Sequence, residues 1–176
     1  MTKIQYHFDH VGSYLRPAEL KAAREQFGAG EISQEELLKI QDTQVADLVK
    51  HEVESGLKVV SDGEFGRSWW HLDFLWNLTG FEAYQQEDSY KFHGAKTRTT
   101  NVRIAGKIAE NPNHPFYRDF SYLKSVTPEG VTPKVTIPSP SLVIKRDHRS
   151  DLALDHYDSW QAYLDGLAQA YHDTIQ

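Results

Sequence analysis

The sequence has no cysteine among its 176 residues. Disulfide bonds, thiolate nucleophiles and zinc sites built from cysteine are therefore excluded within these residues. Long apolar runs are also missing, since no stretch reaches the about 18 residues that indicate a membrane-spanning helix. The polar opening, MTKIQYHFDH, lacks the charged and then apolar regions of a secretion signal. We therefore predict a cytoplasmic protein with no membrane partner.

A basic surface and a phosphate-binding loop are absent as well. The formal net charge is -6 at pH 7, and lysine and arginine are scattered along the chain rather than clustered. This distribution argues against nucleic acid as a partner. Neither a P-loop nor the glycine fingerprint of a dinucleotide-binding fold occurs. The remaining composition, 39% hydrophobic and 25% charged, is typical of a folded globular domain.

The first third of the chain alternates between strand and helix patterns. The extended run YHFDHV predicts a strand, and Pro17 opens a helix that ends at the GAG sequence of residues 28–30. Ser33 and Glu36 have the spacing of a capping box, so a longer helix begins there and ends at Gly56. The short apolar run 57–61 then predicts a strand that is buried in a parallel sheet.

The rest of the chain is less regular. Residues 65–133 form a long aromatic-rich connection with one predicted strand, NVRIAGKIA, and connections of this length usually carry function. Residues 135–137 predict a third core strand, and Pro138 and Pro140 forbid a helix and indicate a rigid loop after it. The last segment predicts a helix with one apolar face, formed by Trp160, Leu164, Leu167, Tyr171 and Ile175.

Alternating strands and helices predict an α/β fold with a parallel sheet. A complete TIM-type (α/β)8 barrel needs about 250 residues. Only about three core strands are predicted here, and the last helical pattern reaches Gln176 without a glycine or proline stop. We expect residues 1–176 to be the N-terminal portion of a single barrel domain. This partial barrel would hold the first three or so strand–helix units, with a long irregular loop after the second strand.

Candidate site residues follow the predicted strands, because ligands of parallel α/β proteins bind at the carboxyl ends of strands. They are His10, Gly12 and Ser13 after the first strand, Asp62 and Glu64 after the second, and residues 139–141 after the third.

Each cluster has a functional and a plain interpretation. Glu64 would hold a substrate ammonium group, or Asp62 and Gly63 form a turn that leaves Glu64 in solvent. Gly12 and Ser13 would present N–H groups and a hydroxyl to a substrate carboxylate, or they form an ordinary turn. Asp62 and Glu64 together would serve a carboxylate-based lyase or hydrolase if their environments separated their pKa values.

Three motifs in this order carry a resemblance to a known family: DHVGSYLRP, GLKVVSDGEFGRSWW and KVTIPSPS. With them the sequence resembles the cobalamin-independent methionine synthase family, of the catalytic-barrel type, and in particular its short bacterial single-barrel members. The resemblance implies a TIM-type barrel with the activity of a 5-methyltetrahydropteroyltriglutamate–homocysteine S-methyltransferase. Such an enzyme transfers a methyl group from a methylated folate to the thiol of homocysteine in methionine biosynthesis, with zinc as cofactor.

The resemblance also implies roles for individual residues. Val11, Gly12 and Ser13 match the family's Ile-Gly-Ser loop, which binds homocysteine, and Glu64 matches a glutamate that binds the same amino acid. His10 and Asp62 flank these positions and join them as candidate substrate-binding residues. Arg98, followed by Thr99, is similar to an Arg-Cys pair that binds folate in the larger members.

The sequence departs from the family in its missing metal ligands. The family binds zinc with a His-x-Cys pair, a glutamate and a later cysteine from the second half of the barrel, and this chain has no cysteine. Zinc is therefore expected for the complete family protein, with its ligands absent here, and we expect the 176-residue chain alone to be inactive. We assign no catalytic or metal residue.

A second departure concerns the methyl donor. The tryptophan that stacks on folate in the family has no counterpart in PSLVIKRDHRSD, so homocysteine or a related thiol is the expected partner while the folate donor stays open. An alternative of another class is a non-catalytic α/β domain that covers its open sheet edge by forming a homo-oligomer.

Overall fold

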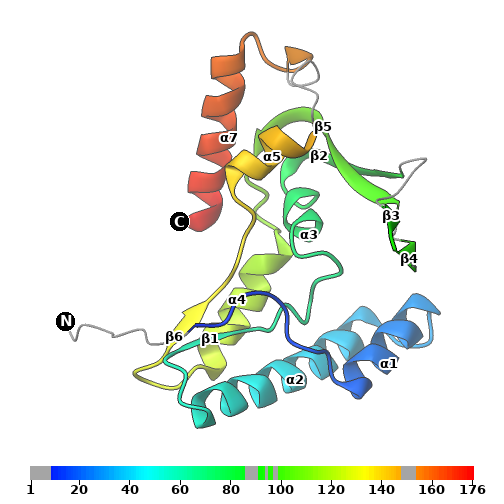
Figure 1. The fold of residues 1–176 in the computed structure, drawn as a ribbon, viewed down its shortest axis with the longest axis vertical. Helices are drawn as coiled ribbons and strands as arrows, with labels where there is room; N and C mark the ends of the chain where they lie inside the picture. Colours follow the sequence, from blue (N-terminus) through cyan, green and yellow to red (C-terminus); the bar gives the residue numbers. More distant parts are fainter. Residues whose placement is uncertain (1–8, 86–90, 94, 97–98, 148–153) are drawn as a thin grey trace. The chain divides into compact units, whose positions relative to one another are not determined.

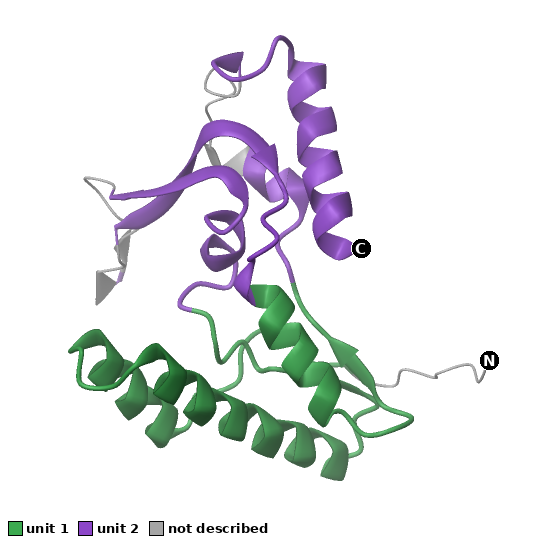
Figure 2. Ribbon diagram, turned by 180° about the vertical axis from the view of Figure 1, so that it is seen from behind, with its two compact units in different colours: residues 1–67, 116–136 green, residues 68–115, 137–176 purple. Residues whose placement is uncertain are grey.

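The computed structural model describes residues 9–85, 91–93, 95–96, 99–147 and 154–176 (Figure 1). The chain divides into two compact units (Figure 2). The first comprises Met1–Arg67 and Phe116–Thr136, and the second comprises Ser68–Pro115 and Ile137–Gln176. The first segment of the second unit lies in sequence between the two segments of the first unit, and its second segment follows them.

Three helices of the first unit cover a short sheet. Helix α1 spans Ala18–Gly28, α2 spans Gln34–Glu54 and α4 spans Pro115–Val126. The predicted capping box starts α2, where the Ser33 hydroxyl accepts from the Glu36 N–H and the Glu36 carboxylate accepts from the Ser33 N–H at 2.8 Å. Both helix predictions for residues 17–56 are therefore confirmed.

The sheet of this unit consists of β1 (Val59–Ser61) and β6 (Thr132–Lys134). The two strands are parallel, with Val59 opposite Thr132 and Ser61 opposite Lys134. Their carboxyl ends therefore leave the sheet at the same edge. The core beneath them is apolar and is formed by Leu20, Val45, Val49, Val60, Phe65 and Leu123.

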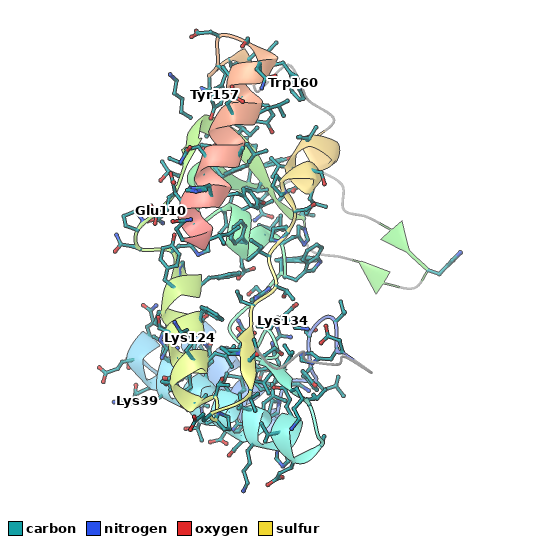
Figure 3. All side chains as sticks on the ribbon, turned by 90° about the vertical axis from the view of Figure 1, so that its left-hand side faces the viewer. Lys39, Glu110, Lys124, Lys134, Tyr157 and Trp160 are labelled. Atoms are coloured by element: carbon teal, nitrogen blue, oxygen red, sulfur yellow. The ribbon has the colours of Figure 1, made fainter. Side chains whose placement is uncertain are left out.

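The second unit is built around an antiparallel hairpin. Strands β2 (Thr79–Gln85) and β5 (Thr100–Ala109) pair along their length, with the short strands β3 (Lys91–Phe92) and β4 (Ala95–Lys96) between them in sequence. Helix α3 covers Leu72–Leu75, α5 covers Pro140–Asp147 and α7 covers Trp160–Ile175. Helix α7 packs against β5, and the nearby Tyr157 hydroxyl, labelled in Figure 3, accepts from the Ile108 N–H at 2.6 Å.

Two strand predictions are shifted or wrong. The third core strand forms at Thr132–Lys134 rather than at 135–137, because the Thr132 N–H pairs with the Lys58 carbonyl and Val135 onward has already left the sheet. Residues 9–17 form no strand, and the earlier part of the predicted first strand lies outside the described residues.

The prediction that Pro140 forbids a helix is wrong. Pro140 opens α5 and Pro115 opens α4, since a proline in the first turn removes no intrahelical hydrogen bond. The face of α7 is also rotated from the predicted one. Its buried residues are Tyr163, Leu167, Ala170 and Tyr171, whereas Trp160 and Ile175 are exposed.

The α/β class is confirmed, because helices combine with a parallel strand pair and an antiparallel hairpin. Among the described strands the pairing gives three two-stranded sheets and no closed barrel. Within the same residues, none of the helices has the length and apolar character needed to cross a membrane.

Candidate functional site

The turn after β1 places Glu64 in an unusual backbone conformation. Its φ is 58°, the left-handed region that residues with a Cβ rarely adopt. The Asp62 carboxylate accepts from the Glu64 N–H at 3.0 Å, and the Ser61 hydroxyl accepts from the Gly63 N–H at 3.2 Å. Asp62 therefore supports the turn, and Glu64 is buried rather than solvated as the plain interpretation required.

Glycine is needed at Gly63 of this turn. Its φ is 63°, and a Cβ there would lie 2.5 Å from a methyl carbon of Leu48. Gly66 is packed as closely, because a Cβ would lie 2.8 Å from the Asp119 carboxylate. The glycines of DGEFGR thus let the turn approach α2 and α4.

Two arginines hold the backbone carbonyls of the same turn. Arg16 donates to the carbonyls of Glu64 and Arg67 at 2.9 and 2.6 Å. Arg24, on α1, donates to the carbonyls of residues 65, 66 and 67 at 3.2, 3.1 and 3.0 Å. Four successive carbonyls that belong to no helix or sheet are thereby satisfied.

The Glu64 side chain meets a residue from the neighbouring strand. Thr136 follows β6, and its hydroxyl donates to the Glu64 carboxylate at 3.2 Å. The Arg67 guanidinium donates to the same hydroxyl at 3.2 Å and lies 3.8 Å from the carboxylate. In the described part of the chain, no hydrogen bond reaches the other oxygen of Glu64.

His10 joins the N-terminal segment to the end of β1. Its Nε2 lies 2.8 Å from the Ser61 hydroxyl and 3.3 Å from the carboxylate of Glu52, a buried residue of α2. The Glu52 carboxylate also accepts from the Ser61 N–H at 3.0 Å. Lys134, at the end of β6 and labelled in Figure 3, donates to the His10 carbonyl at 2.7 Å and to the Asp9 carboxylate at 2.8 Å.

Burial sets the protonation of this cluster. It lowers the pKa of His10, and the positive charge of Lys134 lowers this pKa further. Burial also raises the pKa of the Glu52 carboxyl against the effect of its hydrogen bonds from Ser61 and Tyr14. The cluster therefore disfavours the charged form of both His10 and Glu52.

The predicted substrate loop lies between two anchors. His10 precedes it, and at its other end the Tyr14 N–H donates to the Gly63 carbonyl at 3.2 Å. Val11, Gly12 and Ser13 are themselves exposed, and Gly12 has a φ of 89°. The structure thus brings His10, Val11, Gly12, Ser13, Asp62 and Glu64 into the first unit, with the loop tied to the Glu64 turn.

Other predicted residues are not part of this cluster. Ser139 and Ser141 belong to the second unit, where their hydroxyls lie 2.8 Å apart at the start of α5. Arg98 lies outside the described residues. Among the described residues there is no group of three or more histidine, aspartate or glutamate side chains that would hold a metal ion.

Known proteins are similar to this chain over most of its length. Residues 9–176 match the family model described as cobalamin-independent synthase, catalytic domain. The chain belongs to this cobalamin-independent methionine synthase family. The predicted resemblance is confirmed, and both the His10–Ser13 segment and the Glu64 turn lie within the matched residues.

Individual relatives are about twice as long. The chain is 38% identical to the uncharacterised protein YxjG of Bacillus subtilis over 99% of its own length and 45% of YxjG. It is 30% identical to the methionine synthase of Sulfolobus acidocaldarius, over 74% of this chain and 37% of that protein. A solved structure from Listeria monocytogenes, assigned as a vitamin-B12 independent methionine synthase, gives a TM-score of 0.63 at 35% identity. That match covers 92% of this chain and 49% of the other.

Several residues of this cluster were not among the predicted site residues. Glu52 interrupts the apolar stripe of α2, three residues after Val49, and a carboxylate on a buried stripe was a detectable signal. Arg67 and Thr136 stood inside the family motifs but received no role. Arg16 and Arg24 gave no signal, because their acceptors are main-chain carbonyls about 40 residues or more away.

The strain at Glu64 predicts an inverted preference between alanine and glycine. Both Glu64→Ala and Glu64→Gly remove the carboxylate, but only glycine adopts the left-handed conformation without strain. We expect the glycine variant to have the higher free energy of unfolding by about 1 kcal/mol, measured by urea denaturation. Asp47, exposed within α2, is the control, since alanine is favoured there by about 1 kcal/mol. Equal stability of the two Glu64 variants would contradict the prediction.

The lowered pKa of His10 predicts a loss of stability in acid. Near and below the unfolded-state pKa of 6.5, His10 binds a proton more readily in the unfolded chain than in the folded chain. The free energy of unfolding therefore decreases as the pH decreases. We expect this loss to be smaller in His10→Gln than in the wild type, measured by thermal unfolding between about pH 7.5 and 5.5. The exposed His93 provides the matched control, His93→Gln. A profile of His10→Gln that parallels the wild type would contradict the assignment.

Proposed function

We propose that this chain supplies the amino-acid-binding part of a methionine-synthase-like methyltransferase. The substrate would be homocysteine or a related small thiol. In the overall reaction the N–CH3 bond of a methylated folate breaks, an S–CH3 bond forms, and the thiol proton is exchanged for the methyl group while the folate nitrogen gains a proton. Membership of the family and the likeness to the methionine synthase of Sulfolobus acidocaldarius support this assignment.

The observation that carries the proposal is the Glu64 carboxylate. It is buried at the carboxyl end of β1, with one oxygen held by Thr136 and the other without a hydrogen bond among the described residues. A buried carboxylate with a free oxygen is suited to an ammonium group, because a charge-assisted hydrogen bond offsets the desolvation of both partners. Glu64 would thus bind the α-ammonium group of the amino acid.

The exposed loop beside Glu64 would bind the α-carboxylate group of the amino acid. Gly12 and Ser13 offer backbone N–H groups and a hydroxyl, which are donors for a carboxylate. His10 and Tyr14 hold the loop from both sides through Ser61 and Gly63. Homocysteine held by its α-ammonium and α-carboxylate groups would leave its thiol, at the other end of the molecule, outside these contacts.

Zinc does not fit the side chains that the structure describes. The family's cysteine ligands have no counterpart in a sequence without cysteine, and no cluster of other ligands forms among the described residues. The parallel pair β1–β6 would be part of a TIM-type barrel, of which residues 1–176 are the N-terminal portion, acting in the cytoplasm.

A binding experiment tests the amino-acid pocket. We expect calorimetric titration of the 176-residue chain to detect L-homocysteine, and Glu64→Gln to weaken its affinity by roughly tenfold or more, the effect of a lost charged hydrogen bond. 4-Mercaptobutanoate, which lacks the amino group, should bind the wild type and Glu64→Gln equally weakly. Glu54→Gln, an exposed change on α2, is the control. Equal affinity of wild type and Glu64→Gln for homocysteine would overturn the proposal.

A second experiment tests whether the chain acts alone. We expect the 176-residue chain, given homocysteine, a methylated folate and a zinc salt, to form no methionine above the protein-free background. The reason is that the family's zinc-binding cysteines are missing from this sequence. Methionine production that rises in proportion to protein concentration would refute this expectation.

A further inference from the structure

The contact between Glu64 and Thr136 depends on the parallel register of the short sheet. Ser61 lies opposite Lys134 at the ends of β1 and β6. Glu64 follows three residues after the end of β1, and Thr136 follows two residues after the end of β6. The two chain segments therefore leave the sheet together, which brings the Thr136 hydroxyl to 3.2 Å from the Glu64 carboxylate.

The direction of this hydrogen bond is fixed by Arg67. A guanidinium group has donors and no acceptor, so the Thr136 hydroxyl accepts from Arg67 at 3.2 Å. A hydroxyl has only one proton, and that proton is left for Glu64. The direct distance from Arg67 to the Glu64 carboxylate is 3.8 Å, beyond hydrogen-bond range. Thr136 is therefore the link between the two charged groups.

Arg67 is itself held in place at the other end of this link. Its side chain is 3% exposed, and its guanidinium carbon lies 4.4 Å from the centre of the Phe116 ring. Its backbone carbonyl accepts from Arg16 and Arg24. Because the Arg67 guanidinium is fixed by packing and by the contacts of its main chain, its hydrogen bond orients the Thr136 hydroxyl.

We infer that Thr136 is a positioning residue for the amino-acid pocket. Its hydroxyl, oriented by Arg67, holds one oxygen of Glu64, so that the other oxygen points to the ammonium group of the substrate. This inference rests on the proposed function. It adds that three hydrogen-bonded residues, Arg67, Thr136 and Glu64, together recognise the amino group; we call them the Arg67–Thr136–Glu64 relay. A carboxylate held at one oxygen loses less rotational freedom on binding than a free one.

Two substitutions separate this role from simple packing. Thr136→Val keeps the shape of the side chain and removes the hydroxyl, whereas Thr136→Ser keeps the hydroxyl. We expect Thr136→Val to weaken L-homocysteine binding by roughly tenfold, in line with loss of a hydrogen bond to a charged group. Thr136→Ser should stay within about threefold of the wild type. The affinity for 4-mercaptobutanoate should be unchanged in both.

The control is Thr132→Val, the same exchange at an exposed position of β6, which should bind both ligands as the wild type does. The inference fails if Thr136→Val binds homocysteine like the wild type. It also fails if Thr136→Ser is as weak as Thr136→Val, or if homocysteine and 4-mercaptobutanoate lose affinity equally. Failure of the proposed function looks different, because homocysteine would then not bind the wild type or would bind Glu64→Gln unchanged.

If the proposed function fails in this way, the hydrogen bond from Thr136 to Glu64 is tested without a ligand. A double-mutant cycle combines Thr136→Val with Glu64→Gln and measures the equilibrium constant of unfolding in urea. We expect the effects to be non-additive by about fivefold or more, since residues in one hydrogen-bond network couple. Additive effects would show that Thr136 does not hold Glu64 and would overturn the inference.

Discussion

The guanidinium groups of Arg16 and Arg24 make the turn after β1 stable, and the candidate site depends on that turn. A left-handed residue with a Cβ costs roughly 1–2 kcal/mol, and the carbonyls of residues 64–67 have no partner in a helix or sheet. The two arginines donate to all four carbonyls. The strained conformation of Glu64 persists because the surrounding donors fit only this path of the chain.

A second polar group lies inside the same unit, and it is tolerated because its partners are complete. Glu52 on α2 is buried, yet its carboxylate receives the Ser61 N–H and hydroxyl and lies beside His10. A buried carboxylate without such partners would strongly destabilise the fold. Here it joins α2, the end of β1 and the N-terminal segment.

Local patterns predicted the local parts of this structure. The capping box at Ser33 depends on neighbours within one helical turn, and this prediction was correct. Glu64 was selected because the end of a parallel strand is a general location for ligands. The shift of β6 to Thr132–Lys134 was not predictable, since the register is set by the pairing with Lys58 and β1. Arg16, Arg24 and Thr136 act through contacts between distant segments, which leave no periodic trace in the sequence.

The link between Glu64 and Thr136 also has a consequence for the order of folding. These residues are 72 positions apart, and the first segment of the second unit, Ser68–Pro115, lies between them in sequence. Closing so long a loop carries an entropic penalty that is recovered only when β6 pairs with β1. The helices α1 and α2 pack through nearby contacts and need no such closure. A partly folded chain can therefore contain both helices and still lack the pocket, which forms only when the returning segment completes the sheet.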